Sequence, residues 1–386
     1  MRLQPVASDD PRDVLRALRG AVLGAGPAIA LGAAPALPDR VPAGTAVVLT
    51  TSGSTGEPKS VVLSRAALTA SALATAARIG EGHWLLSLSG GYVAGVQVMV
   101  RALVTGRDPA ILAGRFTPRA FAHAVSGMHS TAGGERVPTY TSLVPAQLQT
   151  LLDASDDPDV RRALRSFETI LVGGQALPAA VRERAADLGV RVVRTYGSTE
   201  TSGGCVYDGV PLDGVRVAAV DGELRICGPN LADGYLGDPE RTAAAFVTDA
   251  SGVRWYRTGD AGTVEGGVVA VTGRIDNVIV SGGVNVSLDR VERVVQAIPG
   301  LEAAVVVGAS HARWGQTPVI ALAGPAGERL LAVARAAVAA EIGKPARPDR
   351  IVALPEIPRL ASGKPDRRAI TALVAAAESG SPPPRP

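Results

Sequence analysis

The sequence predicts an α/β protein built from a large N-terminal domain of βαβ layers with a small barrel-like region, followed by a small α+β domain. Strand-like apolar runs alternate with helical runs between residues 46 and 194. After residue 200 the apolar runs become short and are separated by Gly-rich turns. A separate α+β pattern then occupies residues 278–377. Alternating β and α units imply a mostly parallel sheet with helices on both of its faces.

In the N-terminal half, a short helix is expected at 13–24, a Gly/Pro/Ala-rich loop over 25–44, and strands at 46–49 and 61–63. Ser64 is positioned to cap a helix over 65–79, since its hydroxyl can accept from a free N–H of the first turn. Further strands are expected at 84–88, 109–112, 139–144, 169–172 and 190–194, and helices at 93–105, 118–125, 145–153, 160–164 and 178–188.

The C-terminal half contains two different sequence patterns. Short strands at 215–220, 223–227, 255–257 and 268–272 indicate an antiparallel or barrel-like region. The following α+β pattern has strands at 278–280, 303–307, 318–323 and 351–354, and helices at 288–298, 330–342 and 366–377. A boundary near Asp276 gives domains of residues 1–275 and 276–377. The tail 378–386, E-S-G-S-P-P-P-R-P, is expected to be disordered, because it has no apolar residues to bury.

Composition excludes several function classes. The 386 residues are 46% hydrophobic and 19% charged, with a net charge of +3 and no block of basic residues, which gives nucleic-acid binding no support. The two cysteines, Cys205 and Cys227, form no CxxC pair, so neither a disulfide framework nor a zinc site is expected. No apolar run approaches the roughly 18 residues that would cross a bilayer. We therefore expect a cytoplasmic protein without a membrane partner.

The segment 50–60, T-T-S-G-S-T-G-E-P-K-S, follows an apolar run and is suited to binding polyphosphate. Its hydroxyls and backbone N–H groups can surround anionic oxygens, and Lys59 adds a positive charge. The segment narrowly misses the Walker pattern G-x-x-x-x-G-K-[ST]. Pro58 stands where that pattern has glycine, and it lacks an N–H to offer a phosphate. The apolar residues 61–63 also predict a strand where a Walker loop begins a helix. A plain surface turn remains an alternative for this stretch alone.

The same segment resembles the T-S-G-S-T-G-x-P-K signature of the adenylate-forming (acyl-CoA synthetase) superfamily. Companion motifs of that superfamily follow in the expected order. They are G-G-Q-A-L at 173–177, Y-G-S-T-E at 196–200, Y-R-T-G-D at 256–260, G-R-I-D at 273–276, S-G-G-V-N-V at 281–286 with Glu292, and P-R-L-A-S-G-K at 358–364. The resemblance spans nearly the whole chain, and it implies ATP, Mg²⁺ and CoA as the cofactor and co-substrates.

The resemblance also implies residue roles. Catalysis would fall to Lys364, the adenylation lysine, with Glu200, Thr199 and Lys59. The nucleotide would be held by Thr51, Ser52, Gly53, Ser54, Thr55, Gly56 and Lys59, by Gly173, Gly174 and Gln175, by Tyr196, Gly197, Ser198 and Thr199, and by Asp260 and Arg274. Glu200 would hold Mg²⁺, a hard cation that takes oxygen ligands. Ser281, Gly282 and Gly283 would line the CoA tunnel. Asp276 would be the hinge about which a mobile C-terminal domain turns.

Some stretches are longer than the superfamily motifs require. The segment 196–209, Y-G-S-T-E-T-S-G-G-C-V-Y-D-G, resembles the o-succinylbenzoate–CoA ligases of menaquinone biosynthesis, as do 141–148 and 93–101. The short N-terminal part resembles the actinobacterial form. One departure is Gly91-Tyr92, where that family has two histidines. Because this acid has a second carboxylate, the pocket should offer it a donor, and the substrate contacts are expected among Tyr92, Gln97, Arg101 and Ser142.

Three alternatives stay open. The chain could be another aryl- or acyl-CoA ligase, a stand-alone adenylation domain that loads a carrier protein, or a non-catalytic nucleotide-binding protein. An adenylation domain for amino acids would show an acidic residue in 89–94 to hold the substrate amine, and none is present. The intact Lys364, Glu200 and Asp260 favour an enzyme over a scaffold. The expected partner is a small aromatic carboxylic acid; a homodimer is left open.

Overall fold

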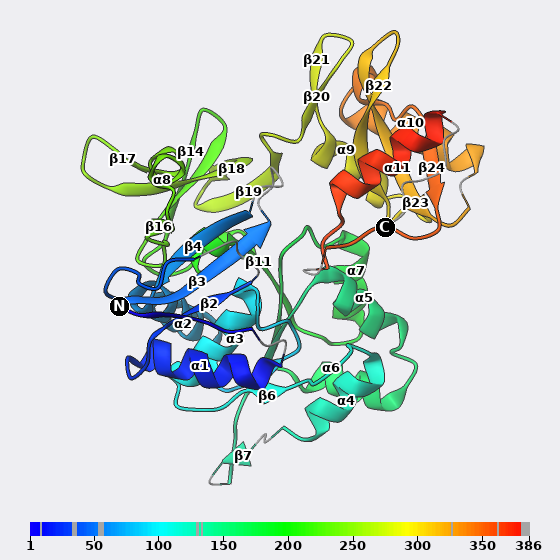
Figure 1. Cartoon of the computed structure of the whole chain (residues 1–386). Helices are drawn as coiled ribbons and strands as arrows, with labels where there is room; N and C mark the ends of the chain where they lie inside the picture. The colour runs from blue at the N-terminus through cyan, green and yellow to red at the C-terminus, as the bar shows by residue number, and fades with distance from the viewer. Residues whose placement is uncertain are drawn as a thin grey trace.

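The computed structural model describes residues 1–7, 10–32, 37–52, 58–128, 131–132, 134–325, 327–360 and 363–379. These residues form four five- or seven-stranded sheets with helices against them (Figure 1). Three of the sheets belong to the part that precedes residue 276, and the fourth follows it. No helix in the described ranges combines the length and the apolar character needed to cross a membrane.

The first sheet carries the phosphate-loop segment. Its strands, in spatial order, are β1 (Leu3–Pro5), β2 (Ala28–Leu31), β3 (Thr45–Ser52), β4 (Pro58–Ser64) and β16 (Gly234–Tyr235). β3 and β4 form an antiparallel hairpin, so the strand predicted after the loop is confirmed and a Walker-type helix is absent there. The loop expected over 25–44 is wrong at β2. Its four residues are buried and pair in parallel with β3, with Ile29 opposite Val47. The apolar run is too short to predict a strand from the sequence, and the pairing with β3 stabilises it.

The second sheet is the mostly parallel one that the alternating pattern predicts. Its strands, in spatial order, are β13 (Val210–Pro211), β12 (Gly203–Tyr207), β11 (Val192–Ser198), β10 (Thr169–Val172), β9 (Thr139–Leu143), β5 (His83–Leu86) and β6 (Ala110–Ile111). β6, β5, β9, β10 and β11 run parallel, whereas β12 and β13 are antiparallel additions. β11 extends four residues beyond the predicted strand, so Tyr196, Gly197 and Ser198 belong to the sheet itself.

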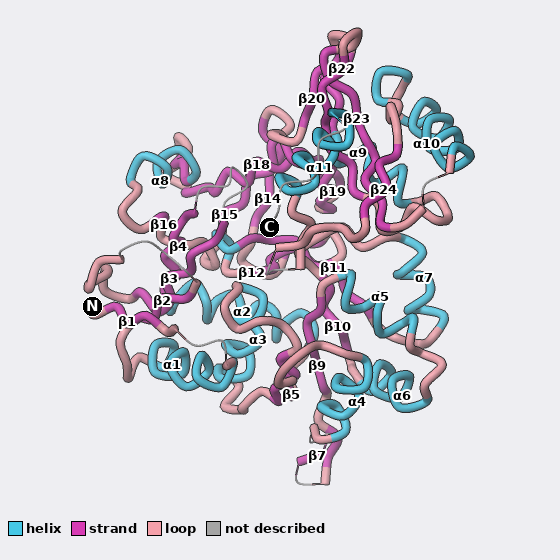
Figure 2. The backbone as a smooth tube through the Cα atoms, turned by 45° about the vertical axis from the view of Figure 1, so that its right-hand side comes forward, coloured by secondary structure: helices cyan, strands magenta, loops and turns pink. Residues whose placement is uncertain are grey.

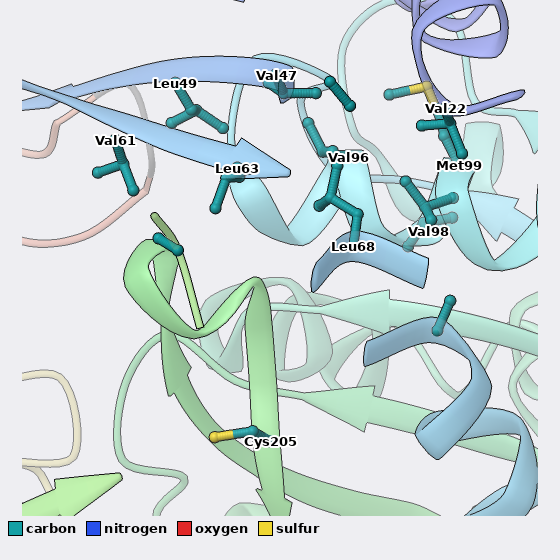
Figure 3. Close-up of a cluster of buried hydrophobic side chains, with 14 of the residues drawn as sticks. Val22, Val47, Leu49, Val61, Leu63, Leu68, Val96, Val98, Met99 and Cys205 are labelled. Atoms are coloured by element: carbon teal, nitrogen blue, oxygen red, sulfur yellow. The ribbon is translucent and has the colours of Figure 1, made fainter. Parts of the chain in front are cut away.

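Helices cover both faces of this second sheet, as expected. They are α2 (Arg65–Ile79), α3 (Val93–Val104), α4 (Pro118–Ser126), α5 (Pro145–Asp153), α6 (Pro158–Ser166) and α7 (Ala179–Asp187), while α1 (Pro11–Leu23) packs against β2 and β3 of the first sheet and against α2 and α3. The predicted cap is present, because Ser64 Oγ accepts from Ala67 N at 3.1 Å. A large core joins α1–α3 to the first two sheets, and Figure 3 shows Leu49 and Leu63 of the hairpin beside Leu68 and Val96. A second core lies under α4–α7.

The third sheet is the antiparallel, barrel-like region. It contains β14 (Arg216–Val220), β15 (Glu223–Cys227), β17 (Phe246–Thr248), β18 (Arg254–Glu265) and β19 (Val268–Arg274). The hairpin of β18 and β19 places Asp260 opposite Arg274, so residues from two different motifs face one another across one ladder. The helix α8 (Pro239–Ala245) and the strands β16 and β17 were not predicted from the sequence.

The fourth sheet forms the C-terminal part, seen edge-on in Figure 2. Its strands are β20 (Val278–Ser281), β21 (Val284–Ser287), β22 (Val305–His311), β23 (Gly315–Ala323) and β24 (Ile351–Leu354), and its helices are α9 (Leu288–Gln296), α10 (Glu328–Glu341) and α11 (Arg367–Ser379). α9 and α10 share one core, and α11 packs in a second. The helix α11 continues through Ser379, so the disordered tail cannot begin at 378. Residues 380–386 lie outside the described ranges.

Four minor elements complete the described chain. The short strands β7 (Thr131–Ala132) and β8 (Glu135–Arg136) pair with each other, and two 3₁₀ turns, η1 (Thr199–Thr201) and η2 (Lys344–Ala346), connect larger elements. Of these, η1 matters most for function, because it directly continues β11 and carries Glu200. The division of the chain at residue 276 stays a prediction.

Candidate active site

Three of the sheets meet at a cavity of about 150 Å³. Its walls are Lys59 from β4, Tyr196, Gly197 and Ser198 from β11, Glu200 from η1, Ile226 from β15, Tyr256, Thr258 and Asp260 from β18, and Arg274 from β19. Segments that are more than 200 residues apart in the chain thus converge on one space. Four of the predicted motifs contribute to these walls, which makes the cavity the candidate active site.

Glu200 is a buried carboxylate held by a cation and a phenol. Its side chain is 2% exposed, and Oε1 lies 2.5 Å from Lys59 Nζ. Tyr235 donates its hydroxyl to the same oxygen at 3.0 Å, and Lys59 Nζ sits 5.2 Å from the centre of the Tyr235 ring. Burial raises the pKa of Glu200, but the Lys59 charge and hydrogen bonds to the carboxylate outweigh it, so the net pKa is lowered. Glu200 is therefore kept ionised.

Asp260 is the second carboxylate of the cavity. Tyr196 donates its hydroxyl to Oδ2 at 2.6 Å, and Arg274 Nη1 donates to Oδ1 at 3.1 Å. Burial raises the pKa of Asp260, while Tyr196 and Arg274 oppose that rise only in part. The pKa of the Tyr196 phenol is raised by burial and by the nearby Asp260 charge. Each carboxylate oxygen of Asp260 thus accepts one hydrogen bond from the protein. Each oxygen can accept a further one, so the two together could bind the two hydroxyls of a vicinal diol.

Arg274 connects this carboxylate to the predicted hinge. Its Nε and Nη2 donate to the two carboxylate oxygens of Asp276 at 3.0 and 3.1 Å, a bidentate pair. Its Nη1 also donates to Thr258 O at 2.9 Å. Burial acts to lower the pKa of Arg274, but Asp276 and Asp260 raise it further than burial lowers it. The guanidinium therefore stays charged between the two acids.

Lys364 reaches the site from the C-terminal part of the chain. Two backbone hydrogen bonds join its neighbourhood: Leu360 N donates to Lys364 O, and Gly363 N donates to Leu360 O, both at 2.8 Å. A Cβ added to Gly174 would lie 3.8 Å from Lys364 Cε, so this lysine runs directly past the predicted G-G-Q segment. Burial lowers the pKa of Lys364, and the charges of Asp260 and Glu200 oppose that shift. Protein atoms crowd around the ammonium group, although the residue as a whole retains solvent-exposed surface.

Other predicted nucleotide contacts lie around this centre. Thr51 pairs with Lys59, and Ser52 with Pro58, at the end of the β3–β4 hairpin. Gly173 leaves no room for a side chain, because a Cβ there would come within 2.3 Å of Thr195 Oγ1. Thr199 begins η1, and both Thr199 and Gln175 are half-buried. Gly53, Ser54, Thr55 and Gly56 lie outside the described residues.

The segment predicted to line the CoA tunnel is not at this cavity. Ser281 is buried in the fourth sheet, where its hydroxyl donates to Pro345 O at 2.8 Å. Gly282 and Gly283 form the turn between β20 and β21 with positive φ, and Gly282 is in close contact with the ring of Trp314. Figure 1 shows this hairpin projecting away from the first three sheets. The structure therefore brings Lys364, but not the glycine segment, to the candidate site.

The predicted substrate residues lie along α3 and β9. Tyr92 is the N-cap residue of α3 and is half-buried, and burial raises its pKa. Gln97 is buried one turn later beside Gly203, whose added Cβ would lie 3.1 Å from Gln97 Cγ. Its Oε1 has no hydrogen-bond partner. Ser142 is buried in β9, and its carbonyl oxygen accepts from Ser87 Oγ at 3.1 Å.

Arg101 is the fourth predicted substrate residue, and it is a buried cation. It is 5% exposed; Nη2 donates to the Tyr207 hydroxyl at 3.2 Å, and the guanidinium lies 5.0 Å from the centre of the Trp84 ring. Its Nε has no partner, and within the described part of the chain no carboxylate forms an ion pair with it. Burial lowers the pKa of Arg101. A buried cation without an internal anion is costly, which makes it suitable for a bound one.

Sequence reasoning missed Tyr235 as a site residue and quoted Tyr256 only as part of its motif. Tyr256 lines the cavity, and burial raises its pKa well above that of a free phenol. The sequence could have indicated both tyrosines as candidate site residues, because a chain with only six tyrosines and 3% aromatic residues makes each of them unusual. Tyr235 was not recognisable as a partner of Glu200, since only the pairing of β16 with β4 brings it there.

Comparison with known protein families matches the chain on both sides of the predicted boundary. Residues 7–236 match the family described as AMP-binding enzyme. This range covers more than half of the sequence and contains the motifs that bear Lys59, Gly174 and Glu200. The chain belongs to the AMP-binding enzyme family. Residues 290–364, which end on Lys364, match the C-terminal domain of the AMP-binding enzymes.

Within this family the chain is similar to proteins that are named as 2-succinylbenzoate–CoA ligases. A probable 2-succinylbenzoate–CoA ligase of Mycobacterium tuberculosis is 39% identical over 334 residues, which cover 84% of this chain and 83% of that protein. The 2-succinylbenzoate–CoA ligase of Enterococcus faecalis is 30% identical over 346 residues, with 83% and 67% covered. Among solved structures, the Bacillus subtilis o-succinylbenzoate CoA synthetase in complex with the acyl-adenylate OSB-AMP has a TM-score of 0.72 at 27% identity, covering 84% and 69%.

Proposed function

We propose that this AMP-binding enzyme is an ATP-dependent 2-succinylbenzoate–CoA ligase that acts in menaquinone biosynthesis. The main structural support for adenylate formation is the position of Lys364. This lysine lies beside Gly174 and is close enough to Glu200 and Asp260 to interact with their charges. A lysine that reaches a nucleotide site from the C-terminal part of the chain is suited to neutralising charge during adenylate formation. The identity of the acid rests on the similar ligases.

In the first half-reaction, an oxygen of the substrate carboxylate attacks the α-phosphorus of ATP. A new P–O bond forms, the bond from the α-phosphorus to the bridging oxygen breaks, and pyrophosphate leaves with the electron pair. Negative charge builds on phosphoryl oxygens, so catalysis depends on positioning and on charge neutralisation. Lys364 and Lys59 supply positive charge, while Asp260 accepts from the ribose hydroxyls. Tyr196 would pack on the adenine.

The donor set of the cavity also fits Mg²⁺. Glu200 is an ionised oxygen ligand on the cavity wall, and magnesium is commonly bound by one or two carboxylates together with substrate phosphates. The described residues contain no cluster of three or more histidine, cysteine or acidic side chains, so a site built only from protein ligands is not present there. When bound, the ion would neutralise charge on the departing pyrophosphate. Glu200 would hold it, and Lys59 would then be free to contact phosphate.

In the second half-reaction, the sulfur of CoA attacks the carbonyl carbon of the acyl-adenylate, and AMP leaves. In this structure Ser281–Gly283 lies away from the cavity, which supports an arrangement suited to adenylation. Reaching the thioester-forming arrangement requires the C-terminal part to turn, and Asp276 is the proposed hinge. ATP and CoA are both cytoplasmic substrates, which is consistent with the proposed cytoplasmic location.

The choice of acid is supported by Arg101. o-Succinylbenzoate carries a second carboxylate that does not react, and burying it requires a donor or a counter-charge. Arg101 is a buried guanidinium with an unpartnered Nε and no ion-paired acid among the described residues. It lies one turn beyond Gln97 on α3, and Gln97 adjoins the Gly203 backbone. We propose that Arg101 neutralises the unreacted carboxylate and that Gln97, Tyr92 and Ser142 shape the rest of the pocket.

A panel of acids tests this function. Purified protein with ATP and Mg²⁺ should release pyrophosphate when given o-succinylbenzoate, and should form the thioester once CoA is added. Benzoate, which lacks the second carboxylate, and a medium-chain fatty acid serve as matched alternatives. Pyrophosphate release is followed by a coupled assay, and the thioester by mass spectrometry.

The same panel discriminates between the candidate functions. Turnover of benzoate or of the fatty acid without turnover of o-succinylbenzoate would replace the proposed acid while keeping the ligase assignment. Pyrophosphate release followed by transfer to a carrier protein, but not to CoA, would instead identify a stand-alone adenylation domain. Absence of pyrophosphate release with every acid would contradict adenylation altogether.

A further inference from the structure

Two charged side chains of α9 bind the backbone of β19. Arg274 N donates to Asp289 Oδ2 at 2.7 Å, and Arg293 Nη2 donates to Val271 O and Thr272 O at 3.3 and 3.0 Å. Asp289 and Arg293 are four residues apart, so they stand on the same face of the helix. β18 is the ladder partner of β19, and on its other edge the Val269 N–H bonds Gly209 O, while the backbone groups of Val271, Thr272 and Arg274 face α9. α9 thus contacts the C-terminal end of β19 through an accepting side chain, Asp289, and a donating side chain, Arg293.

These bonds cross the predicted hinge. β19 ends at Arg274, two residues before Asp276, and α9 begins at Leu288, twelve residues after it. Figure 1 shows β19 among the first three sheets and α9 against the fourth. A rotation about Asp276 would therefore separate Asp289 from Arg274 N and Arg293 from the β19 carbonyls. The contact is specific to the orientation seen in this structure.

The backbone at Gly273 permits the close approach of α9. Gly273 has φ 148°, and a Cβ added there would lie 2.9 Å from Asp289 Cβ and 3.1 Å from Ser287 Oγ. Contacts of 2.9 Å between carbon atoms are too short for a side chain to be tolerated without displacement. The glycine of the G-R-I-D motif therefore has a steric reason in this orientation: it lets the start of α9 lie directly on the end of β19.

Asp289 also joins this contact to the segment that carries Lys364. Its Oδ1 accepts from Asn277 Nδ2 at 2.7 Å and lies 3.6 Å from Nη2 of Arg367. Arg367 begins α11 only three residues after Lys364, and it also donates to Glu292 at 2.8 Å. One carboxylate thus links the end of β19, the residue after the hinge, and the start of the helix that follows the lysine.

We propose that Asp289, assisted by Arg293, is a positioning residue for the adenylation half-reaction. It fixes α9 on β19 and thereby holds the C-terminal part where Lys364 lies beside Gly174 and close to the charges of Asp260 and Glu200. Neither side chain lines the cavity, so both act through the placement of Lys364. The identity of residue 277 fits this role, since the Asn277 amide donates to Asp289 where a carboxylate would repel it. This inference rests on the proposed two-step function.

The test compares the two half-reactions. Adenylation is measured as pyrophosphate release without CoA, and thioester formation is measured from synthetic acyl-adenylate and CoA. In Asp289→Ala, adenylation should fall about ten-fold, because a charge-assisted hydrogen bond that holds the orientation is lost, while thioester formation should be unchanged or faster. Arg293→Ala and Asn277→Asp should show the same split. Arg290→Ala, which removes an exposed arginine of the same helix, is the matched control and should alter neither step.

A distance measurement makes the test independent of the acid used. The two native cysteines are buried, so spin labels can be attached at Asp156→Cys and Glu328→Cys, two exposed positions on either side of the hinge. Asp289→Ala should add a second population to the distance distribution that Arg290→Ala does not show. An unchanged distribution, or equal losses in both half-reactions, would overturn the proposal. Failure with o-succinylbenzoate alone would instead count against the proposed acid.

Discussion

Two carboxylates in one cavity are tuned differently by their neighbours. Glu200 has a lowered pKa because Lys59 and hydrogen bonds overcome the effect of burial, whereas Asp260 has a raised pKa because burial outweighs Tyr196 and Arg274. Such differences are expected where one acid must bind a cation and the other accepts hydroxyl hydrogen bonds. The distinction depends on individual partners at 2.5–3.1 Å, not on the residue types alone.

Arg101 gives a prediction at the scale of one residue. Arg101→Met should raise the KM for o-succinylbenzoate about ten-fold or more, because a hydrogen bond to a charged group contributes about 1.5–3 kcal/mol. The KM for benzoate should not change, if benzoate is turned over, since it lacks the second carboxylate. Steady-state kinetics with both acids measures the difference.

The matched control for this variant is Arg107→Met, which removes an arginine just beyond α3 that contacts His83. It should leave both KM values unchanged. Melting temperatures of the two variants separate misfolding from selectivity, because replacing an unpaired buried cation by an apolar side chain is often neutral for stability. An equal rise in both KM values for Arg101→Met would assign Arg101 a purely structural role.

At the scale of elements, the site depends on strand pairs that the motifs do not mention. β4 presents Lys59 on one side, and β16 pairs with β4 so that Tyr235 is opposite Val61. The 3₁₀ turn η1 then places Glu200 between the two side chains. The two-residue strand β16 therefore provides one partner of Glu200, Tyr235, and the β3–β4 hairpin provides the other, Lys59.

This arrangement predicts a change in pH dependence. Glu200 has a lowered pKa in the folded protein, so it is ionised above that pKa and becomes protonated as the pH falls through it. In Lys59→Met the opposing charge is gone, and burial should raise the pKa of Glu200. The acidic limb of the adenylation rate should therefore move to higher pH, as measured by pyrophosphate release across a pH series with Mg²⁺ present.

Lys344→Met serves as the comparison for that series, because Lys344 lies in η2 of the C-terminal part and does not line the cavity. Its profile should superimpose on that of the wild type. A lower rate for Lys59→Met with an unshifted acidic limb would restrict Lys59 to phosphate binding. It would leave another group responsible for keeping Glu200 ionised.

At the scale of the whole molecule, a residue from the C-terminal part of the chain joins the site formed by the first three sheets. Lys364 comes from the loop before α11, and its neighbour Gly174 follows β10 of the second sheet. The first three sheets and the 3₁₀ turn η1 provide the residues that line the cavity itself. We therefore expect adenylation to depend on the placement of the C-terminal part, and the segment around Gly282 that is predicted to line the CoA tunnel is away from the cavity in the same arrangement.

Lys364→Ala should separate the two half-reactions. Adenylation should fall by a factor of roughly 100 or more, because a preorganised charge that stabilises a transition state contributes several kcal/mol. Thioester formation from supplied acyl-adenylate should continue near the wild-type rate, since Lys364 is not needed after the adenylate exists. Single-turnover assays of each step measure this. Equal loss of both steps would contradict the proposed rotation about Asp276.

The sequence by itself determined the family, the alternation of strands and helices and the order of the motifs, because these depend on local pattern and on residue types at fixed spacing. Ser64 as a helix cap and the strand after Pro58 were predictable for the same reason. β2 and β16 were not, since such short strands form only where a neighbouring strand accepts their hydrogen bonds.

Only the tertiary structure decided which charges meet. The partnership of Tyr235 with Glu200, the bidentate contact of Arg274 with Asp276 and the bonds from Asp289 to β19 all depend on folded contacts. Electrostatic effects and hydrogen bonds act over a few ångströms of space, whatever the separation along the chain. The motifs therefore named the candidate groups, and the packing of four sheets determined their ionisation and their partners.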